Sequence, residues 1–175
     1  MNTPGLQAEC DPPLPPVQAD RLKLCVLIVE DDDADAYLIE NALAANPNVT
    51  SVIRATDGVE ALRLVDVGAV HPDLALIDLH MPRKSGFHLL VDFAAGRDPY
   101  FPMVVLTSST APVDAMRSRL RGAARVLTKP ESAAELEVVL AATIQSICTG
   151  ATSPAAKGRA VFDNPAPRQK IRPLN

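Results

Sequence analysis

Cysteine is scarce in this sequence of 175 residues, which carries three. Cys10, Cys25 and Cys148 are odd in number and widely spaced. Cys25 lies in an apolar run, where we expect it to pack as a small hydrophobic side chain. This usage excludes a disulfide framework and a zinc site, and it is typical of a reducing compartment.

Long apolar runs are absent as well. No stretch approaches the roughly 18 to 20 consecutive apolar residues that a membrane-spanning helix needs. Near the N-terminus, Pro4 and Glu9 occupy the region where a secretory signal has its apolar core. We therefore expect a cytoplasmic protein with no membrane partner.

Basic residues are outnumbered by acidic ones. The formal net charge is −4 and the isoelectric point is about 5.3. Because nucleic-acid phosphates are held by a concentrated basic face, we expect no nucleic-acid partner for the folded part.

The central region is flanked by two segments of different composition. Residues 1–20 are rich in proline and lack a periodic apolar pattern, so we expect a flexible leader there. Residues 149–175 form a proline-containing tail that is basic, with five Lys or Arg residues against one acid, Asp163. The chain is 47 % hydrophobic, which is enough for one domain with a real core over residues 21–148.

Within this domain, short apolar runs alternate with longer segments of helical spacing. The predicted strands are Leu24–Val29, Ser51–Ala55, Leu74–Ile77, Met103–Leu106 and Arg125–Leu127. The predicted helices are Ala34–Ala45, Gly58–Val67, Gly86–Phe93, Val113–Arg121 and Ala133–Ile147. Five β-α units are too few to close a barrel and favour an α/β fold with an open, doubly wound parallel sheet. The first, third and fourth strands are apolar enough to be buried on both faces.

Three helices show an apolar stripe that we expect to face the sheet. In the first helix the stripe is Leu38, Ala42 and Ala45 with Tyr37; in the second it is Ala61, Leu62, Leu64 and Val65; in the fifth it is Leu136, Leu140, Ile144 and Ile147.

Residues whose side chains can bind ions or take part in reactions follow four of the strands. They are Glu30 to Asp33 after the first strand, Asp78 after the third, Thr107 to Ser109 after the fourth, and Lys129 with Pro130 after the fifth. In an open parallel sheet, ligands bind beyond the carboxyl ends of the strands. If the first and third strands are neighbours, Glu30, Asp31 and Asp78 share one pocket, where their charges repel one another. A hard divalent cation relieves such repulsion, and Mg²⁺ fits best because it needs few protein oxygens; Mn²⁺ is an alternative.

The roles follow from what an aspartate needs in order to attack phosphorus. Its charge must be relieved and the transferring oxygens must be held. Asp78 is the candidate nucleophile, Lys129 offers a positive charge to one phosphoryl oxygen, and Thr107 offers its hydroxyl to another. For Asp32 and Asp33, capping of the following helix is an equally good explanation.

The motifs as a set resemble the receiver domains of response regulators in two-component signalling. They are the runs Val29 to Asp32, Leu76 to Pro82 with Gly86, Leu106 to Ser108, and Gly122 and Ala123 ahead of Lys129 and Pro130. The resemblance implies a flavodoxin-like sheet of order 2-1-3-4-5, phosphorylation of Asp78 by a histidine kinase, and metal binding by Glu30, Asp31, Asp78 and the backbone carbonyl of His80. It also implies a cis peptide bond before Pro130.

A narrower similarity concerns short regulators without an output domain. Asp33 to Asp35 with Leu38 and Ile39 is similar to single-domain regulators that partner phytochrome-type sensor kinases. A histidine phosphotransfer protein is a further partner that the family allows. We expect signalling through protein contacts.

Four positions in the family pattern concern switching and phosphoryl lifetime. Val126 stands where the family usually has an aromatic residue, so an aromatic rotamer switch cannot operate. Ser108 and Ser109 follow Thr107 in the switch loop, and Ser109 and His80 occupy positions that tune phosphoryl lifetime in the family. For His80, an ordinary exposed loop residue is the alternative.

Two other functions use similar residues. A phosphohydrolase of the haloacid-dehalogenase type also has an Asp nucleophile after an apolar strand, but it has a second Asp two residues later, where this chain has His80. A receiver-like binding module that takes no phosphate is the other alternative.

The fifth helix indicates a second covered surface. Val138, Val139, Ala141 and Ala142 extend its apolar character beyond the stripe that faces the sheet. We expect a homodimer through the fifth strand and fifth helix, with the C-terminal tail contributing.

Overall fold

The structure is a computed structural model that describes residues 23–96 and 101–149. The leader and the tail beyond Thr149 lie outside the described residues. The strands are β1 (Leu24–Val29), β2 (Val49–Ala55), β3 (Leu74–Ile77), β4 (Met103–Thr107) and β5 (Arg125–Thr128). The helices are α1 (Asp33–Ala44), α2 (Gly58–Asp66), α3 (Gly86–Gly96), α4 (Pro112–Leu120) and α5 (Ala133–Cys148). No helix in these ranges is long and apolar enough to cross a membrane.

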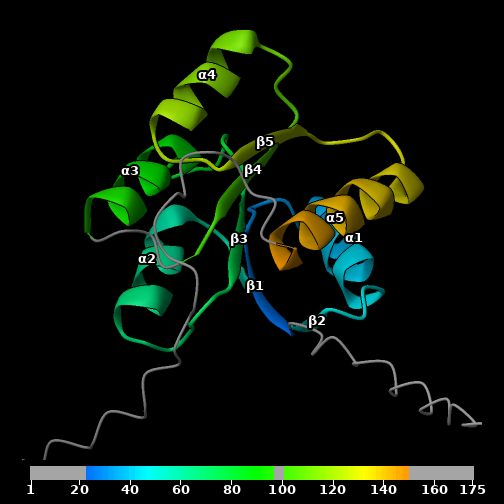
Figure 1. Ribbon diagram of the computed structural model, residues 1–175. Coiled ribbons are helices and arrows are strands. Elements are labelled where there is room, and N and C mark those ends of the chain that lie inside the picture. The colour runs from blue at the N-terminus through cyan, green and yellow to red at the C-terminus, as the bar shows by residue number, and fades with distance from the viewer. Residues whose placement is uncertain (1–22, 97–100, 150–175) are drawn as a thin grey trace, which may run out of the picture.

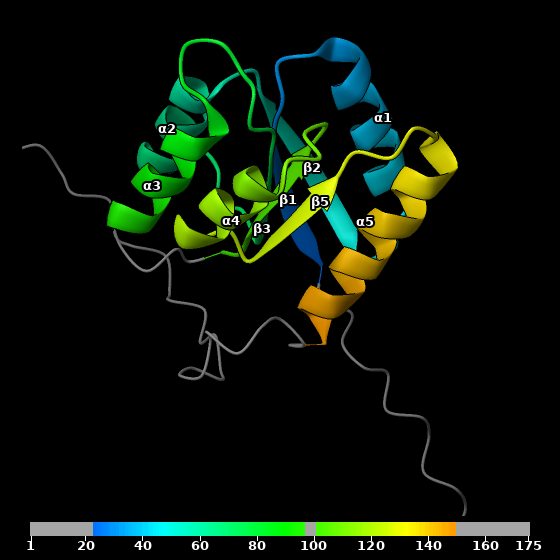
Figure 2. The same cartoon turned by 90° about the horizontal axis from the view of Figure 1, so that it is seen from above.

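The strands form one parallel sheet of order β2-β1-β3-β4-β5, which confirms the predicted doubly wound fold. Helices α1 and α5 cover one face, and α2, α3 and α4 lie on the other (Figure 1). Because all strands run the same way, their carboxyl ends meet at one rim. At the opposite rim, β1 begins and α5 ends (Figure 2).

Two apolar clusters hold the layers together, one on each face of the sheet. Alternate residues of β1 divide between them: Leu27 and Val29 join the cluster with α2 and α3, whereas Val26 and Ile28 join the one with α1 and α5. β3 and β4 are buried along their whole length, and β1 is buried except for half-buried Cys25. The prediction of strands buried on both faces is confirmed.

The predicted stripe of the first helix is wrong in its phase. Tyr37 is 65 % exposed and Leu38 is also exposed, while the buried residues of α1 are Ala36, Ile39 and Leu43. These three are spaced three and four apart, so the two large aliphatic side chains enter the core together and the Tyr37 phenol stays in water. Of the predicted stripe, Ala42 packs against the core, and Ala45 is the exposed C-cap residue.

The other two predicted stripes agree with the structure. In α2, Ala61 is buried, and Leu62, Leu64 and Val65 pack against the core. In α5, Leu136, Leu140 and Ile144 are buried, and Ile147 packs beside them.

Gly86 fixes the start of α3 close to the backbone of the loop after β3. A Cβ atom at this position would overlap the carbonyl oxygen of Asp78. The Gly86 amide also donates to the Leu79 carbonyl, 3.2 Å away. Backbone on both sides leaves no flexible side chain to move aside, so the rim tolerates no larger residue here.

We therefore expect Gly86→Ala to lower the free energy of unfolding by about 2 kcal/mol or more, because the overlap is with backbone. Chemical denaturation followed by circular dichroism measures the change. Ala95→Ser, on the exposed side of the same helix, should change stability by less than about 0.5 kcal/mol. Equal stability of the two variants would contradict this close approach.

Candidate functional site

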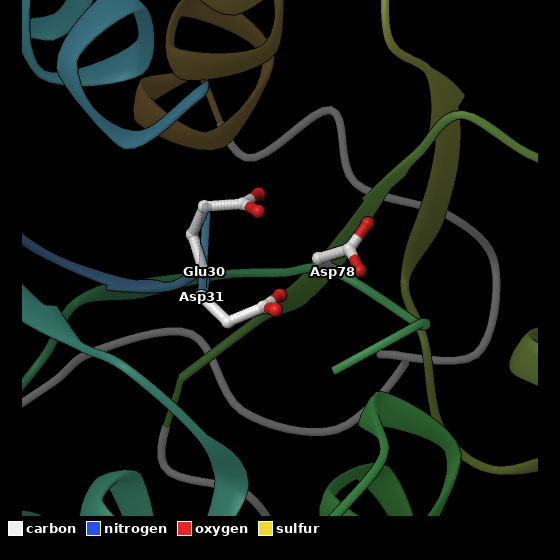
Figure 3. A group of neighbouring side chains, drawn as sticks. All are labelled: Glu30, Asp31 and Asp78. Carbon is white, nitrogen blue, oxygen red and sulfur yellow. The ribbon is translucent and has the colours of Figure 1, made fainter. Parts of the chain in front are cut away.

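Three carboxylates meet where β1 and β3 end. Glu30 and Asp31 follow β1, Asp78 follows β3, and these strands are hydrogen-bonded neighbours. One oxygen of each of the three side chains lies within 4.8 Å of the others. Figure 3 shows the Glu30 and Asp31 carboxylates extending toward Asp78. Glu30 and Asp78 are buried and Asp31 is exposed, so the group is open to solvent on one side.

The Lys129 ammonium balances part of this negative charge. Its Nζ lies 2.8 Å from Glu30 Oε2 and 3.4 Å from Asp78 Oδ1. It also lies 2.6 Å from Oδ2 of Asp35, in the first turn of α1. The strand ends predicted to converge therefore do converge.

Burial and charge act in opposite directions on these groups. Burial raises the pKa of the Glu30 carboxyl, and the hydrogen bond from Lys129 opposes this in part. For Lys129, burial alone would lower the pKa, but hydrogen bonds to Asp35 and Glu30 and the charge of Asp78 raise it above its usual range. These contacts therefore favour the protonated, positively charged form of Lys129.

Asp78 and Thr107 are positioned by backbone on neighbouring strands. The His80 amide donates to Asp78 Oδ2 over 2.6 Å, and the Asp78 amide donates to the Val29 carbonyl over 3.0 Å. Thr107 is buried at the end of β4, and its carbonyl accepts from the Lys129 amide over 2.8 Å. Its hydroxyl oxygen accepts from the Ser109 amide over 3.2 Å.

The residues assigned to switching and tuning have different surroundings. Ser109 Oγ donates to Asp114 Oδ2 over 2.6 Å and thereby tethers the loop to the first turn of α4. Ser108 and the His80 side chain are exposed. Val126 packs, partly buried, against the cluster that includes α2 and α3 residues.

The expected cis peptide before Pro130 is wrong for this structure. The described residues contain no cis peptide bond, so the Lys129–Pro130 bond is trans. For a bond to proline, trans is the lower-energy form by about 0.5–1 kcal/mol. The Lys129 side chain reaches the acidic residues from this backbone.

The capping explanation holds for Asp32 but not for Asp33. Asp32 Oδ1 accepts from the Ala34 and Asp35 amides, each at 2.9 Å, and so caps α1. Asp33 instead pairs with Arg54 at 2.7 Å.

Arg54 and Asp35 are two contributors to the site that sequence reasoning missed. From β2, Arg54 donates to the carbonyls of Glu30 (3.1 Å) and Asp31 (3.3 Å), so it fixes the backbone that carries two of the acids. The signal was a lone basic residue in a strand beside the strand that ends in acids. Asp35 stood in the sequence motif, and its place in the first turn of the helix that directly follows β1 is the signal that could have found it.

The loop between β3 and α3 has its own anchor. Arg83 has a left-handed backbone, with φ of 61°, and pairs with Asp57, which is fully buried and caps α2. This ion pair ties the segment that follows Asp78 to the neighbouring helix.

Residues 26–141 match the family model of the response regulator receiver domain. The chain belongs to this family. This receiver domain is similar to the response regulator Rcp1 of Synechocystis, with 31 % identity over 90 residues that make up 48 % of this chain and 61 % of Rcp1. The structure of Mn²⁺-bound Rcp1 matches with a TM-score of 0.63 and 28 % identity, over 70 % of this chain and 92 % of that one.

Two further relatives place the domain in short and long proteins. The phosphorylated cyanobacterial phytochrome response regulator RcpA matches with a TM-score of 0.67 and 27 % identity, over 75 % of this chain and 97 % of that one. The sensor histidine kinase CheAY of Helicobacter pylori is 30 % identical over 125 residues, which are 69 % of this chain and 15 % of CheAY. The chain spans less than a third of the first curated relatives it matches.

A divalent cation should stabilise this receiver domain in a pH-dependent way. The pKa of the Glu30 carboxyl is higher in the folded state than its ordinary value of 4.5, so Glu30 stabilises the fold when it is protonated, below pH 4.5. This stabilisation is lost as the pH rises through the folded-state pKa. Near neutral pH, Mg²⁺ or Mn²⁺ at ten times its Kd should raise the free energy of unfolding by about 1.4 kcal/mol.

Thermal unfolding with the metal ion or with a chelator measures the effect. The increase in Tm should be several degrees near neutral pH and should shrink as the pH falls, because Glu30, whose pKa burial raises, takes up a proton that competes with the metal ion. Asp31→Asn should lose most of it. An increase of the same size in that variant would contradict metal binding by this group.

Proposed function

We propose that this receiver domain accepts a phosphoryl group on Asp78 from the phosphohistidine of a sensor histidine kinase and signals through protein contacts. The observation that carries the proposal is the meeting of Glu30, Asp31 and Asp78 within 4.8 Å, with the Lys129 ammonium 3.4 Å from Asp78. Such a group provides a nucleophile, a place for a cation and a fixed positive charge in one pocket.

The transfer is a displacement at phosphorus. An Asp78 carboxylate oxygen forms the new O–P bond as the P–N bond of the donor breaks, and the imidazole nitrogen keeps the bonding electron pair. Lys129 pairs with one phosphoryl oxygen, and the Thr107 hydroxyl donates to another. The His80 amide holds the second Asp78 oxygen in place.

Glu30, Asp31, Asp78 and the His80 backbone carbonyl are the proposed ligands of Mg²⁺. The three carboxylates are hard oxygen donors, and the exposed side at Asp31 leaves room for water and phosphoryl oxygens. When bound, the ion neutralises carboxylate charge and polarises the phosphoryl group. Mn²⁺, which Rcp1 binds, is an alternative ion for the same donors.

Two rival functions predict different fates for the phosphoryl group. The exposed His80 gives no second carboxylate for a phosphohydrolase, and a binding module without phosphorylation does not need a partly buried Lys129 beside Asp78. We propose that the only chemistry of the chain is its own phosphorylation and dephosphorylation. Acetyl phosphate should give stoichiometric label on a receiver, continuous release of phosphate with a hydrolase, and no label on a binding module.

Asp78→Asn should abolish Mg²⁺-dependent label from acetyl phosphate and leave the fold intact, because Asn is isosteric and lacks the nucleophilic oxygen. Intact-protein mass spectrometry measures the added phosphoryl group. Asp66→Asn, an exposed position at the end of α2, is the matched control and should be labelled normally. Full incorporation by Asp78→Asn would remove the central role given to this residue.

The similarity to RcpA supports a phytochrome-type kinase as partner, and a histidine phosphotransfer protein could take the phosphoryl group onward. We propose that the chain meets these partners in the cytoplasm. The net charge of −4 argues against a nucleic-acid partner.

We further propose a homodimer through β5 and α5 with the C-terminal tail. On α5, Val138 is 68 % exposed, and Ala141 and Ala142 are exposed beside it. Sedimentation at micromolar concentration, with and without a phosphoryl mimic, should give a dimer for the full chain and a weaker dimer for a chain that ends at Gly150. A monomer in every case would rule out the dimer, and an unchanged dimer after truncation would remove the role of the tail.

A further inference from the structure

The Lys129 ammonium has three carboxylate neighbours, and the nearest one is outside the proposed metal site. Nζ lies 2.6 Å from Asp35, 2.8 Å from Glu30 and 3.4 Å from Asp78. The residue proposed to contact a phosphoryl group is therefore held most closely by the first turn of α1, and its longest contact is with the proposed phosphoacceptor.

Solvent access separates the three partners. The side chains of Glu30 and Asp78 are 3 % and 7 % exposed, whereas that of Asp35 is 41 % exposed. A buried carboxylate that loses its cation is left without compensation, but water can hydrate Asp35. Asp35 is thus the partner from which Lys129 can separate most easily.

Resting on the proposed phosphorylation of Asp78, we propose that Asp35 is a positioning residue that holds Lys129 in the unphosphorylated state and competes with the phosphoryl group for it. A phosphoryl group on Asp78 adds negative charge and acceptor oxygens within reach of the Lys129 ammonium, which is already 3.4 Å from Asp78 Oδ1. Lys129 then moves toward Asp78 and releases α1.

The placement of Lys129 gives this release a direction. Lys129 lies between the end of β5 and the start of α5, and Asp35 lies at the start of α1. These helices are side by side on one face of the sheet (Figure 2). Val126, at the position of the family's aromatic switch, packs against the cluster on the opposite face. The Asp35 contact therefore links the phosphorylation site to the α1–α5 layer without any aromatic side chain.

A purely structural ion pair would behave differently from a competing one. Removal of a structural pair lowers stability and leaves phosphoryl affinity unchanged. Removal of a competitor raises the affinity of the site for a phosphoryl group, because Lys129 no longer has to leave Asp35. Asp33 offers a matched control: it is in the same turn with the same charge, 93 % exposed, and its partner is Arg54.

The test uses the full chain with Mg²⁺ and beryllofluoride as the phosphoryl mimic, titrated by ¹⁹F nuclear magnetic resonance. Asp35→Asn should bind beryllofluoride about fivefold more tightly than the unchanged chain, and Asp33→Asn should bind within about twofold of it. In the unchanged chain, beryllofluoride should shift the amide resonances of residues 34–38, and in Asp35→Asn these shifts should be largely lost.

Three results would count against the inference. If Asp35→Asn and the wild-type chain bind beryllofluoride equally well and the α1 shifts are retained, the role of Asp35 is contradicted, but the proposed phosphorylation is not. An equal increase in affinity for both variants attributes the effect to net charge and overturns the specific contact. If the wild-type chain does not bind beryllofluoride in the presence of Mg²⁺, both the proposed phosphorylation and the role of Asp35 are contradicted. Asp35→Ala, which removes the hydrogen-bonding group completely, should reproduce the result of Asp35→Asn.

Discussion

Repulsion among Glu30, Asp31 and Asp78 is the constraint around which the rest of the rim is arranged. Three carboxylates this close would destabilise the fold if nothing opposed them. The Lys129 ammonium relieves part of the charge, and Arg54 donates hydrogen bonds to the backbone carbonyls of Glu30 and Asp31. We propose that the remaining negative charge favours a cation between these carboxylates and, when the cation is bound, a phosphoryl group.

The sequence was sufficient to predict the convergence of the site because parallel strands bring their carboxyl ends to one rim. Glu30, Asp78 and Lys129 needed only the strand order to be placed together. The contact between Lys129 and Asp35 was beyond prediction, since it depends on how closely α1 and α5 pack. The rotation of α1 about its own axis was also uncertain, because two adjacent stripes of the helix were both sufficiently apolar. This is why Tyr37 was wrongly predicted to face the sheet. Arg54 acts through backbone carbonyls, which carry no residue-specific signal.

Two features favour a switch that works by exchange of ion pairs and not by movement of an aromatic side chain. Val126 has no ring to move, and it is already packed against the core on the α2 and α3 side. Lys129, by contrast, contacts three carboxylates that differ in their exposure to solvent. An ion pair exchanged between such partners needs little change in packing, so the two states can differ by small shifts and still be distinct to a partner protein.

The two ends of the described domain leave it from the rim opposite the acidic pocket, where β1 begins and α5 ends. Chain attached at either end therefore does not have to pass in front of the pocket on which a kinase would dock. A domain of this shape can be joined to other domains at its N-terminus or its C-terminus and still leave its phosphorylation site open to a phosphoryl donor. Relatives in which it occupies as little as 15 % of the protein are an instance of that freedom.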